Sequence, residues 1–466
     1  MKGLDIFFKP ETVAIVGASK TVGKVGNVIL SNLLESNFRG RVYPVNPYTD
    51  SIYGRRVYAN VKDIPEQVEL AVLATRAEVV PQVMQDCAEK GVRGVIIVSG
   101  GFAEAGEEGA ARQKQVEEIA VKVGMRVVGP NCIGVYDSES EMDTMFMPRY
   151  RMSRPRRGRI AFITQSGAFG IAVLDWAASR GFGVSKFISL GNRIDVDELD
   201  CLEYLADDEQ SKVIALYLES TVDGRRLVDT AKKVVKNKPI VVLKAGVTAK
   251  GAQAVLSHTG SLAGRDEIYE EAFKQSGIIR TYGPQDLFDV ARAMANQPLP
   301  KSDRVAIVTN GGGFGVIATD AVETHGLKMA DFSEKTTKYL REHLPPIVST
   351  RNPVDLVGDA DAERYRLAID ALLEDPNVDE IIVIILFQTP NLQPDIVGVL
   401  AAAADKRQKP ILVCTTGGDF AELHTRMLER AGVQVYPSPR RAVRVMATLL
   451  EYRKYKEKLE DPTKAL

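Results

Sequence analysis

Short apolar runs alternate with amphipathic stretches along most of this chain of 466 residues. Near the amino terminus the apolar runs are TVAIVGA, RVYPVN, LAVLAT, GVIIVSG and RVVGPN. Runs of this length predict buried strands, and the amphipathic stretches between them predict crossover helices. Because strands that alternate with helices form parallel sheets, the sequence predicts an α/β fold.

Two Pro-containing stretches without helical or strand periodicity interrupt this alternation. They are PRYRMSRPRRGR at 148–159 and NQPLPKSD at 296–303. Such breaks are typical of domain boundaries. We therefore expect three domains, at residues 1–148, 158–296 and 303–456.

The second and third segments resemble each other. RIAFITQSGAFGIAVLD at 159 matches RVAIVTNGGGFGVIATD at 304 without a gap, and KPIVVLKAG at 238 matches KPILVCTTG at 409. SGIIRTYGP at 276 then matches AGVQVYPSP at 431, so the offset falls from 171 to 155 and the first copy holds 16 extra residues. The pattern predicts two related flavodoxin-like domains, although common strand-turn-helix patterning is an alternative source of the match.

The charge balance gives no overall electrostatic basis for binding nucleic acid or a membrane. Lys and Arg total 60 and Asp and Glu total 61, for a net charge of −1. The arginine-rich stretch at 148–159 is more typical of a tether or subunit contact than of a nucleic-acid site. No apolar run approaches the roughly 20 residues of a membrane span. The four cysteines lack metal-type spacing, so we expect reduced thiols, no metal site and a cytoplasmic protein.

The first domain opens with a strand, a Gly-rich turn and a helix, a pattern that binds phosphate at the helix start. The residues suited to a phosphate-bearing cofactor are Gly17, Ser19, Lys20, Gly23 and Gly26. Their spacing is not G-x-G-x-x-G, and Asn46 stands where an NAD enzyme has an acidic residue. The sequence therefore favours a nucleotide other than NAD, or glycines that serve only helix packing.

A second phosphate-binding turn is predicted in ITQSGAFG. Ser166, Gly167 and Ala168 would begin a helix whose free N–H groups hold a phosphoryl group. Asn131, in the loop GPNCIGV, is either a ligand for a carbonyl or phosphate group or an ordinary turn residue. The third segment keeps the turn but has lost the serine, so we expect it to be structural.

His258 is one of four histidines and lies in AVLSHTGSLAG, inside the 16 extra residues. Glu219 ends the apolar run VIALYLES, where an unpaired charge is costly. A carboxylate that bonds one imidazole nitrogen leaves the other nitrogen as a nucleophile. We expect Gln388 to be the counterpart of Glu219 in the third segment. The acid would then occur only in the copy that contains the histidine. A helix-capping or ion-paired Glu219 is the alternative.

Together these motifs resemble the α subunit of the ADP-forming acyl-CoA synthetases (acetate:CoA ligase, ADP-forming) and, more distantly, that of succinyl-CoA synthetase. The resemblance rests on GPNCIGV, FITQSGAFG, LYLES, KAGVTAKGAQAVLSHTGSLAG and AFKQSGIIR. It implies a Rossmann-like CoA-binding domain followed by two flavodoxin-like domains. It also implies that His258 is phosphorylated during turnover, that Glu219 bonds it, and that Ser166 and Gly167 hold the phosphate.

The reaction implied by the resemblance is acyl-CoA + ADP + phosphate ⇌ carboxylate + ATP + CoA. No part of the chain resembles the ATP-grasp module that supplies the nucleotide site. The resemblance therefore implies a separate β subunit with Mg²⁺ and ADP or ATP, in an α2β2 assembly. An NAD-type dehydrogenase and a non-catalytic CoA-binding regulatory protein are the alternatives. The preferred carboxylic acid and the choice of ADP or GDP stay open. The CoA contacts also stay open, because Tyr48 stands where related first domains often have a Lys.

Overall fold

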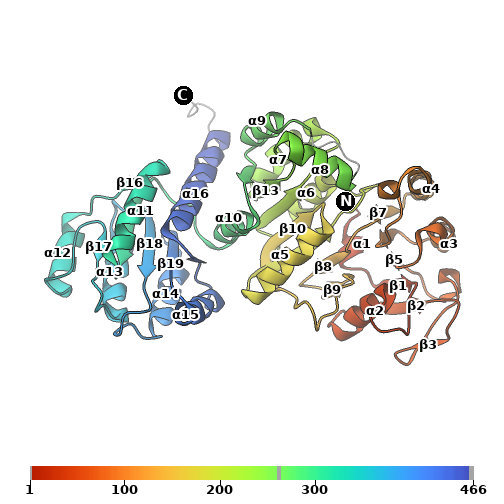
Figure 1. The fold of residues 1–466 in the computed structure, drawn as a ribbon, viewed down its shortest axis with the longest axis horizontal. Coiled ribbons are helices and arrows are strands. Elements are labelled where there is room, and N and C mark those ends of the chain that lie inside the picture. The colour runs from red at the N-terminus through yellow and green to blue at the C-terminus, as the bar shows by residue number, and fades with distance from the viewer. Residues whose placement is uncertain (1–2, 260–263, 461–466) are drawn as a thin grey trace. The chain divides into compact units, whose positions relative to one another are not determined.

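The computed structural model describes residues 3–259 and 264–460, and at positions 257–259 it describes the backbone alone (Figure 1). The chain divides into two compact units, residues 1–287 and residues 288–466. None of the described helices is long and apolar enough to cross a membrane. Both units are built on parallel sheets, as the alternation of strands and helices predicts.

The first sheet has five parallel strands in the order β2-β1-β5-β6-β7. Its strands are β1 (Thr12–Val16), β2 (Arg41–Val45), β5 (Leu70–Leu73), β6 (Gly94–Ile97) and β7 (Arg126–Val128). The helices of this part are α1 (Asp5–Phe8), α2 (Val25–Glu35), α3 (Val80–Lys90) and α4 (Glu107–Val123). The short elements are β3 (Ser51–Ile52), β4 (Arg55–Arg56) and the 3-10 turns η1 (Val61–Asp63), η2 (Ala77–Val79) and η3 (Ala103–Ala105). The strand order reverses between β1 and β5, and such reversal points are where open α/β sheets bind ligands.

The second sheet has seven strands in the order β14-β13-β12-β10-β11-β8-β9. Its parallel strands are β10 (Arg156–Thr164), β11 (Gly183–Ser189), β12 (Val213–Leu218), β13 (Ile240–Lys244) and β14 (Ile279–Thr281). The antiparallel strands are β8 (Val135–Asp137) and β9 (Met142–Asp143), which extend the sheet beyond β11. The helices are α5 (Gly167–Ser179), α6 (Glu198–Asp207), α7 (Gly224–Val235), α8 (Ala249–Thr259), α9 (Asp266–Ser276) and α10 (Pro284–Asn296). Residues 135–143, which precede the predicted boundary at 148, thus hydrogen-bond into the second sheet.

The third sheet, in the second unit, has the order β16-β15-β18-β19-β20, and β17 also pairs with β15. Its strands are β15 (Arg304–Thr309), β16 (Lys328–Met329), β17 (Val354–Asp355), β18 (Glu380–Ile385), β19 (Ile411–Thr415) and β20 (Val435–Tyr436). The helices are α11 (Gly312–Thr324), α12 (Glu334–His343), α13 (Ala362–Glu374), α14 (Ile396–Asp405), α15 (Asp419–Arg430) and α16 (Pro439–Glu460). Every residue of β18 and β19 is buried, which explains why their sequences are almost uninterrupted apolar runs.

The internal repeat appears in the positions of the elements. Helix α11 begins and ends 145 residues after α5, and β19 begins and ends 171 residues after β13. Between β13 and β14 the first copy has two helices, α8 and α9, whereas the second copy has α15 alone between β19 and β20. The first copy therefore has one more helix in the region that carries His258.

Candidate functional site

The Ser166 turn lies at the carboxyl end of β10. Ser166 is the N-cap of α5, and its hydroxyl accepts a hydrogen bond from the N–H of Phe169 at 3.4 Å. Gly167 is the first residue of the helix, and a Cβ there would lie 2.8 Å from Ile133 of the loop GPNCIGV. This close approach accounts for a glycine at position 167. The first N–H groups of the helix have no partner within the helix itself and are suited to bind an anion.

Glu219 lies at the same edge of the sheet, directly after β12, and is 3% exposed. Its N–H donates to Oε1 of Gln165 at 2.8 Å, and Gln165 precedes Ser166 in the chain. The neighbouring strands β10 and β12 pair in register at Thr164 and Tyr217, which brings the two turns together. The structure thus places Glu219 beside the predicted phosphate-binding turn.

Tyr217 hydrogen-bonds the Glu219 carboxylate, and burial together with this carboxylate raises the pKa of Tyr217 to about 12. The phenol is protonated near neutral pH and donates to the carboxylate. This bond holds the side chain of Glu219, whereas Gln165 holds its backbone.

The counterpart of Glu219 in the second unit is Leu386, which corrects the expectation of Gln388. The N–H of Leu386 donates to Oδ1 of Asn310 at 2.9 Å, which matches the bond between Glu219 and Gln165. The prediction was wrong because β18 ends two residues earlier than its apolar pattern suggests, and Gln388 instead donates to the carbonyl of Thr416. The acid is therefore specific to the copy that contains His258.

His258 lies in the last turn of α8, and its side chain is outside the described part of the chain. Helix α8 follows β13, and β13 is the neighbour of β12 in the sheet. The helix therefore leaves the same sheet edge that ends in Glu219. Residues 260–263, which follow this turn, also lie outside the described residues.

Lys244 is a buried cation at this edge that the sequence analysis did not single out. It ends β13, is 3% exposed, donates to the carbonyl of Ala245 and lies over the ring of Tyr269 at 4.6 Å from the centroid. Burial lowers its pKa to about 8, although the carboxylates of Asp266 and Glu219 oppose the shift. A charged residue at the tip of an apolar strand was the signal for Glu219, and the same signal in VVLKAG would have found Lys244.

The loop GPNCIGV joins the two sheets of the first unit. Asn131 has a left-handed backbone with φ of 59°, and its N–H donates to the carbonyl of Ser99 at 2.9 Å. Its side-chain Nδ2 lies 3.4 Å from Oδ1 of Asn192, in the loop after β11. Asn131 is thus placed between the first sheet and the Ser166 edge of the second sheet.

A cavity of about 540 Å³ lies at the carboxyl ends of β1, β2 and β5, where the strand order reverses. Gly17, Asn46, Tyr48 and Arg76 are among the residues that line it. Asn46 donates from Nδ2 to the carbonyl of Ala18 at 2.7 Å, so this strand end presents an amide rather than a carboxylate to a ligand. A ribose held as in NAD enzymes needs an acid there.

The glycines of the first turn permit close packing. Gly17 and Gly23 have φ of 90° and 86°, and a Cβ on Gly26 would lie 2.1 Å from the carbonyl oxygen of Gly17. The hydroxyl of Ser19 accepts a hydrogen bond from the N–H of Thr21 at 3.1 Å, and Lys20 lies between these two residues. Gly26 therefore serves helix packing, and the conformation of Gly17 and Gly23 is one that other residues rarely adopt.

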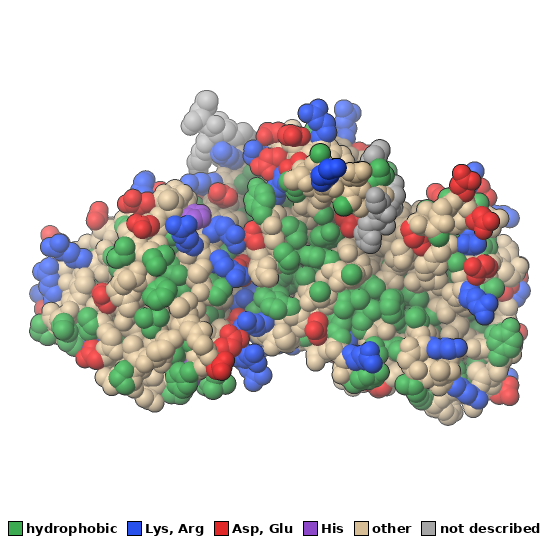
Figure 2. Space-filling view, viewed as in Figure 1, with side chains coloured by type: hydrophobic (Ala, Val, Ile, Leu, Met, Phe, Trp, Pro, Cys, Tyr) green, Lys and Arg blue, Asp and Glu red, His purple; other side chains and the backbone are tan. Residues whose placement is uncertain are grey.

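Three of the six arginines in residues 148–159 pair with acids of the hairpin of β8 and β9. Arg149 and Arg154 pair with the buried Asp143 at 3.0 and 2.8 Å, and Arg157 pairs with Glu139 at 2.9 Å. Figure 2 shows basic and acidic side chains mixed over the face that it presents. Among the described residues there is no group of three His, Cys, Asp or Glu side chains able to hold a metal ion.

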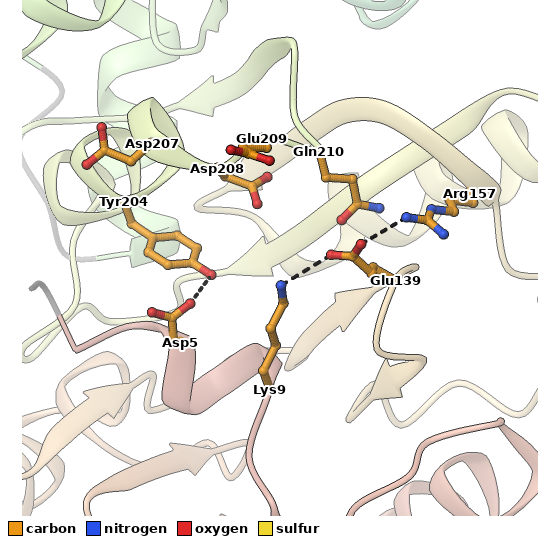
Figure 3. Close-up of a pocket in the computed structure, with 9 residues that line it drawn as sticks. All are labelled: Asp5, Lys9, Glu139, Arg157, Tyr204, Asp207, Asp208, Glu209 and Gln210. Atoms are coloured by element: carbon orange, nitrogen blue, oxygen red, sulfur yellow. Dashed lines mark hydrogen bonds and ion pairs between the residues drawn. The ribbon is translucent and has the colours of Figure 1, made fainter.

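A larger cavity, of about 940 Å³, lies at the amino end of β10, opposite the end that carries Ser166. Its charged residues pair largely with each other: Lys9 and Arg157 both contact Glu139 (Figure 3). The Tyr204 hydroxyl donates to Asp5 at 3.0 Å. None of the predicted site residues lines this cavity.

Three family descriptions match successive parts of the chain. Residues 11–138 match the CoA binding domain, residues 157–294 the succinyl-CoA ligase like flavodoxin domain, and residues 305–457 the Ligase-CoA domain. Together they span nearly all of the sequence and agree with the three sheets.

Curated relatives and solved structures match over similar lengths. The chain is 43% identical to the α subunit of ADP-forming acetate–CoA ligase I of Pyrococcus furiosus, over 98% of this chain and 99% of the relative. It is also 43% identical to ADP-forming acetate–CoA ligase I of Archaeoglobus fulgidus, over 98% of this chain but 64% of that relative. The structure of a dinucleotide forming acetyl-coenzyme A synthetase 1 of Ca. Korarchaeum cryptofilum, in complex with phosphate and ADP, matches with a TM-score of 0.92 at 35% identity and covers 99% of both chains.

Proposed function

The chain belongs to the family of α subunits of ADP-forming acetate–CoA ligases, and we propose that with a β subunit it catalyses acyl-CoA + ADP + phosphate ⇌ carboxylate + ATP + CoA. The observation that carries this proposal is the meeting of Glu219 and the Ser166 turn, bridged by Gln165, at the sheet edge from which α8 departs. We assign CoA to the cavity at the ends of β1, β2 and β5, whose glycines and amide suit a phosphate-bearing ligand other than NAD.

The first chemical step joins phosphate to the acyl group. A phosphate oxygen attacks the thioester carbonyl, the C–O bond forms, the C–S bond breaks, and CoA leaves as the thiolate. The N–H groups at the start of α5, at Gly167 and Ala168, hold the phosphate, and Asn131 orients the substrate from the adjoining loop. Helix starts favour anions through their free donors and through the macrodipole.

His258 then takes the phosphoryl group. A ring nitrogen attacks phosphorus, the N–P bond forms, and the P–O bond to the acyl group breaks to release the carboxylate. Glu219 accepts a hydrogen bond from the other ring nitrogen, which fixes the tautomer and stabilises the charge that develops on the ring. Tyr217 and Gln165 support this role because they hold Glu219 in place before reaction.

The phosphoryl group finally passes to ADP. We assign the nucleotide, with the Mg²⁺ that neutralises its phosphates, to an ATP-grasp β subunit in an α2β2 assembly. The names of the Pyrococcus relatives as α subunits support a partner chain. Acetate is the expected acid, because these relatives are named as acetate–CoA ligases.

Labelling with phosphate tests this function. The chain, co-expressed with its β subunit, is incubated with acetyl-CoA and radioactive phosphate without ADP, and acid-labile label on the chain is counted. His258→Ala should abolish the label, whereas His343→Ala, at the exposed end of α12, should keep it. Equal label on the His258→Ala variant would overturn the proposal.

Binding calorimetry tests the CoA assignment separately. CoA should bind to the chain, and NAD should not. Gly17→Val places a side chain against the carbonyl of Ala74 at a left-handed position, so it should weaken CoA binding strongly. Gly224→Ala, at a helix start with open space around it, is the control and should bind CoA normally. Tight binding of NAD in place of CoA would refute the assignment.

A further inference from the structure

The loop after β11 contacts both sheets of the first unit through two consecutive residues. Asn192 donates from Nδ2 to Oε2 of Glu104 at 2.6 Å and to Oε1 of Gln113 at 2.9 Å. Glu104 lies in η3 and Gln113 in α4, both beside the first sheet. Asn192 therefore anchors this loop to the CoA-binding domain.

Arg193 points the other way, into the turn that follows β12. Its Nη1 donates to the carbonyl of Ser220 at 2.9 Å and to Oε2 of Glu198 at 3.0 Å, and its Nη2 donates to Oγ of Ser220 at 3.0 Å. The side chain of Arg193 is only 10% exposed, and that of Glu198 is fully buried. Three bonds from one planar group hold the turn more rigidly than a single ammonium would.

The backbone of Arg193 is in the left-handed region, with φ of 58°. A non-glycine residue pays on the order of 1 kcal/mol or more in this conformation and keeps it only where its surroundings impose it. Here the neighbouring N–H of Asn192 donates to the carbonyl of Pro130 at 2.8 Å, and that of Ile194 to Gly129 at 3.2 Å. The loop GPNCIGV thus holds Arg193 in this conformation.

Gln165 also holds this turn. Its Nε2 donates to Oε2 of Glu198 and to the carbonyl of Ser220, both at 2.9 Å, so it shares two acceptors with Arg193. Its Oε1 accepts from the N–H groups of Glu219 and Ser220 at 2.8 and 3.1 Å. The turn that presents Glu219 is therefore held by both Gln165 and Arg193.

We propose that Arg193 is a positioning residue for Glu219 and that, through Asn192, it ties the Glu219 turn to the CoA-binding domain. The inference rests on the proposed function, in which Glu219 orients His258. A loosened Ser220 turn would let the carboxylate move away from the imidazole. Phosphorylation of His258 would then slow, while CoA, which we assign to the cavity at the ends of β1, β2 and β5, would bind normally.

The central test is a double-mutant cycle in the labelling assay with acetyl-CoA and radioactive phosphate. Arg193→Lys keeps a positive charge beside Glu198 but cannot make all three bonds, and it should slow phosphoenzyme formation at saturating acetyl-CoA at least about tenfold. The half-saturating acetyl-CoA concentration should change less than about twofold. In a Glu219→Gln background, Arg193→Lys should have almost no further effect, because the group it positions is already lost.

Two further variants separate positioning from simple loss of an ion pair. Ser220→Ala removes the hydroxyl that accepts from Nη2 of Arg193 and changes no charge, so it should slow labelling a few-fold. This variant replaces Arg193→Lys in the test if Arg193→Lys does not fold. Arg226→Lys alters ion pairs with Asp197, the N-cap of α6, and with Asp200 and Glu203, and leaves the bonds of Arg193 to Ser220 and Glu198 in place, so it should label normally.

Additive effects of Arg193→Lys and Glu219→Gln would overturn the inference, as would wild-type labelling of Arg193→Lys. Label that persists in His258→Ala would instead overturn the proposed function. The two failures are therefore distinguishable within one set of proteins.

Discussion

The ring of Tyr217 stacks on the ring of Phe169, with centroids 4.2 Å apart and planes 26° from parallel. Phe169 lies in the first turn of α5, where its N–H donates to Ser166, and Tyr217 hydrogen-bonds Glu219. One ring pair therefore connects the helix start that we assign to phosphate with the carboxylate that we assign to His258.

Tyr217→Phe should slow phosphoenzyme formation several-fold and cost about 1 kcal/mol of stability, because it keeps the stack and removes one hydrogen bond. The labelling rate and urea unfolding measure the two effects. Tyr365→Phe is the matched control, since the fully buried Tyr365 hydroxyl donates to the carbonyl of Ile384 at 2.8 Å in the second unit. The control should lose similar stability and label normally, and slow labelling in both variants would contradict a specific role for Tyr217.

Ser166→Ala should cost about 1 kcal/mol as the loss of a helix N-cap and should also slow labelling, because the helix start holds the phosphate. Ser333→Ala removes an equivalent cap from α12, where the hydroxyl accepts from Thr336 at 3.2 Å. Urea unfolding should show similar losses for the two variants. Only Ser166→Ala should change the labelling rate, and an unchanged rate would argue against the phosphate assignment.

The free energy of unfolding of the wild-type chain should fall as the pH falls from 10.5 to 8, because Lys244 must be charged while buried, and Lys244→Met should abolish this fall. The folded pKa of Lys244 is about 8 and its ordinary value is 10.5, so the unfolded chain takes up this proton first as the pH falls. Wild-type stability relative to the variant should therefore fall by up to about 3 kcal/mol from pH 10.5 to pH 8 and stay level below pH 8. Urea unfolding at several pH values measures this difference, and a constant difference would refute the low pKa.

Glu380→Gln should stabilise the second unit above about pH 5. Glu380 is fully buried at the start of β18, neither carboxylate oxygen has a hydrogen-bond partner among the described residues, and burial raises its pKa well above 4.5. As the pH rises through the window above 4.5, the unfolded chain loses this proton first, so wild-type stability falls and that of the neutral amide does not. The gain should reach about 1–3 kcal/mol at pH 8.

The exposed Glu363 is the control, because its pKa is shifted in the opposite direction to that of Glu380. A hydrogen bond from Arg366 lowers its pKa, so its contribution to stability is present above pH 4.5 and is lost as the pH falls below it. Glu363→Gln should therefore bring no gain at pH 8. A gain at pH 8 from both substitutions would show that the effect is not specific to the buried carboxyl group.

Much of the architecture was predictable because burial on both faces of a parallel strand leaves a visible apolar run. The repeat predicted that α11 would follow β15 as α5 follows β10, and the helix bounds agree at the offset of 145 residues. Ser166 and Glu219 were found because a small turn before a helix and a charge at the end of a buried strand are local signals.

Gln165, Arg193 and Tyr217 gave no such signal, because a buried polar group becomes informative only when its partners are known. Arg193 and Ser220 are 27 residues apart and bond only because β11 and β12 both flank β10 in the sheet. The counterpart of Glu219 was misassigned to Gln388 for the same reason, since strand register rather than sequence position decides that Leu386 stands there.

The sequence by itself determined the alternating strands and helices, the repeat, the family resemblance and the residue types at the site, because each depends on the local order of side chains. Only the tertiary structure decided which side chains meet. Neighbouring parallel strands deliver their carboxyl ends to one edge, and that edge joins Gln165, Glu219 and Arg193 into one hydrogen-bonded group.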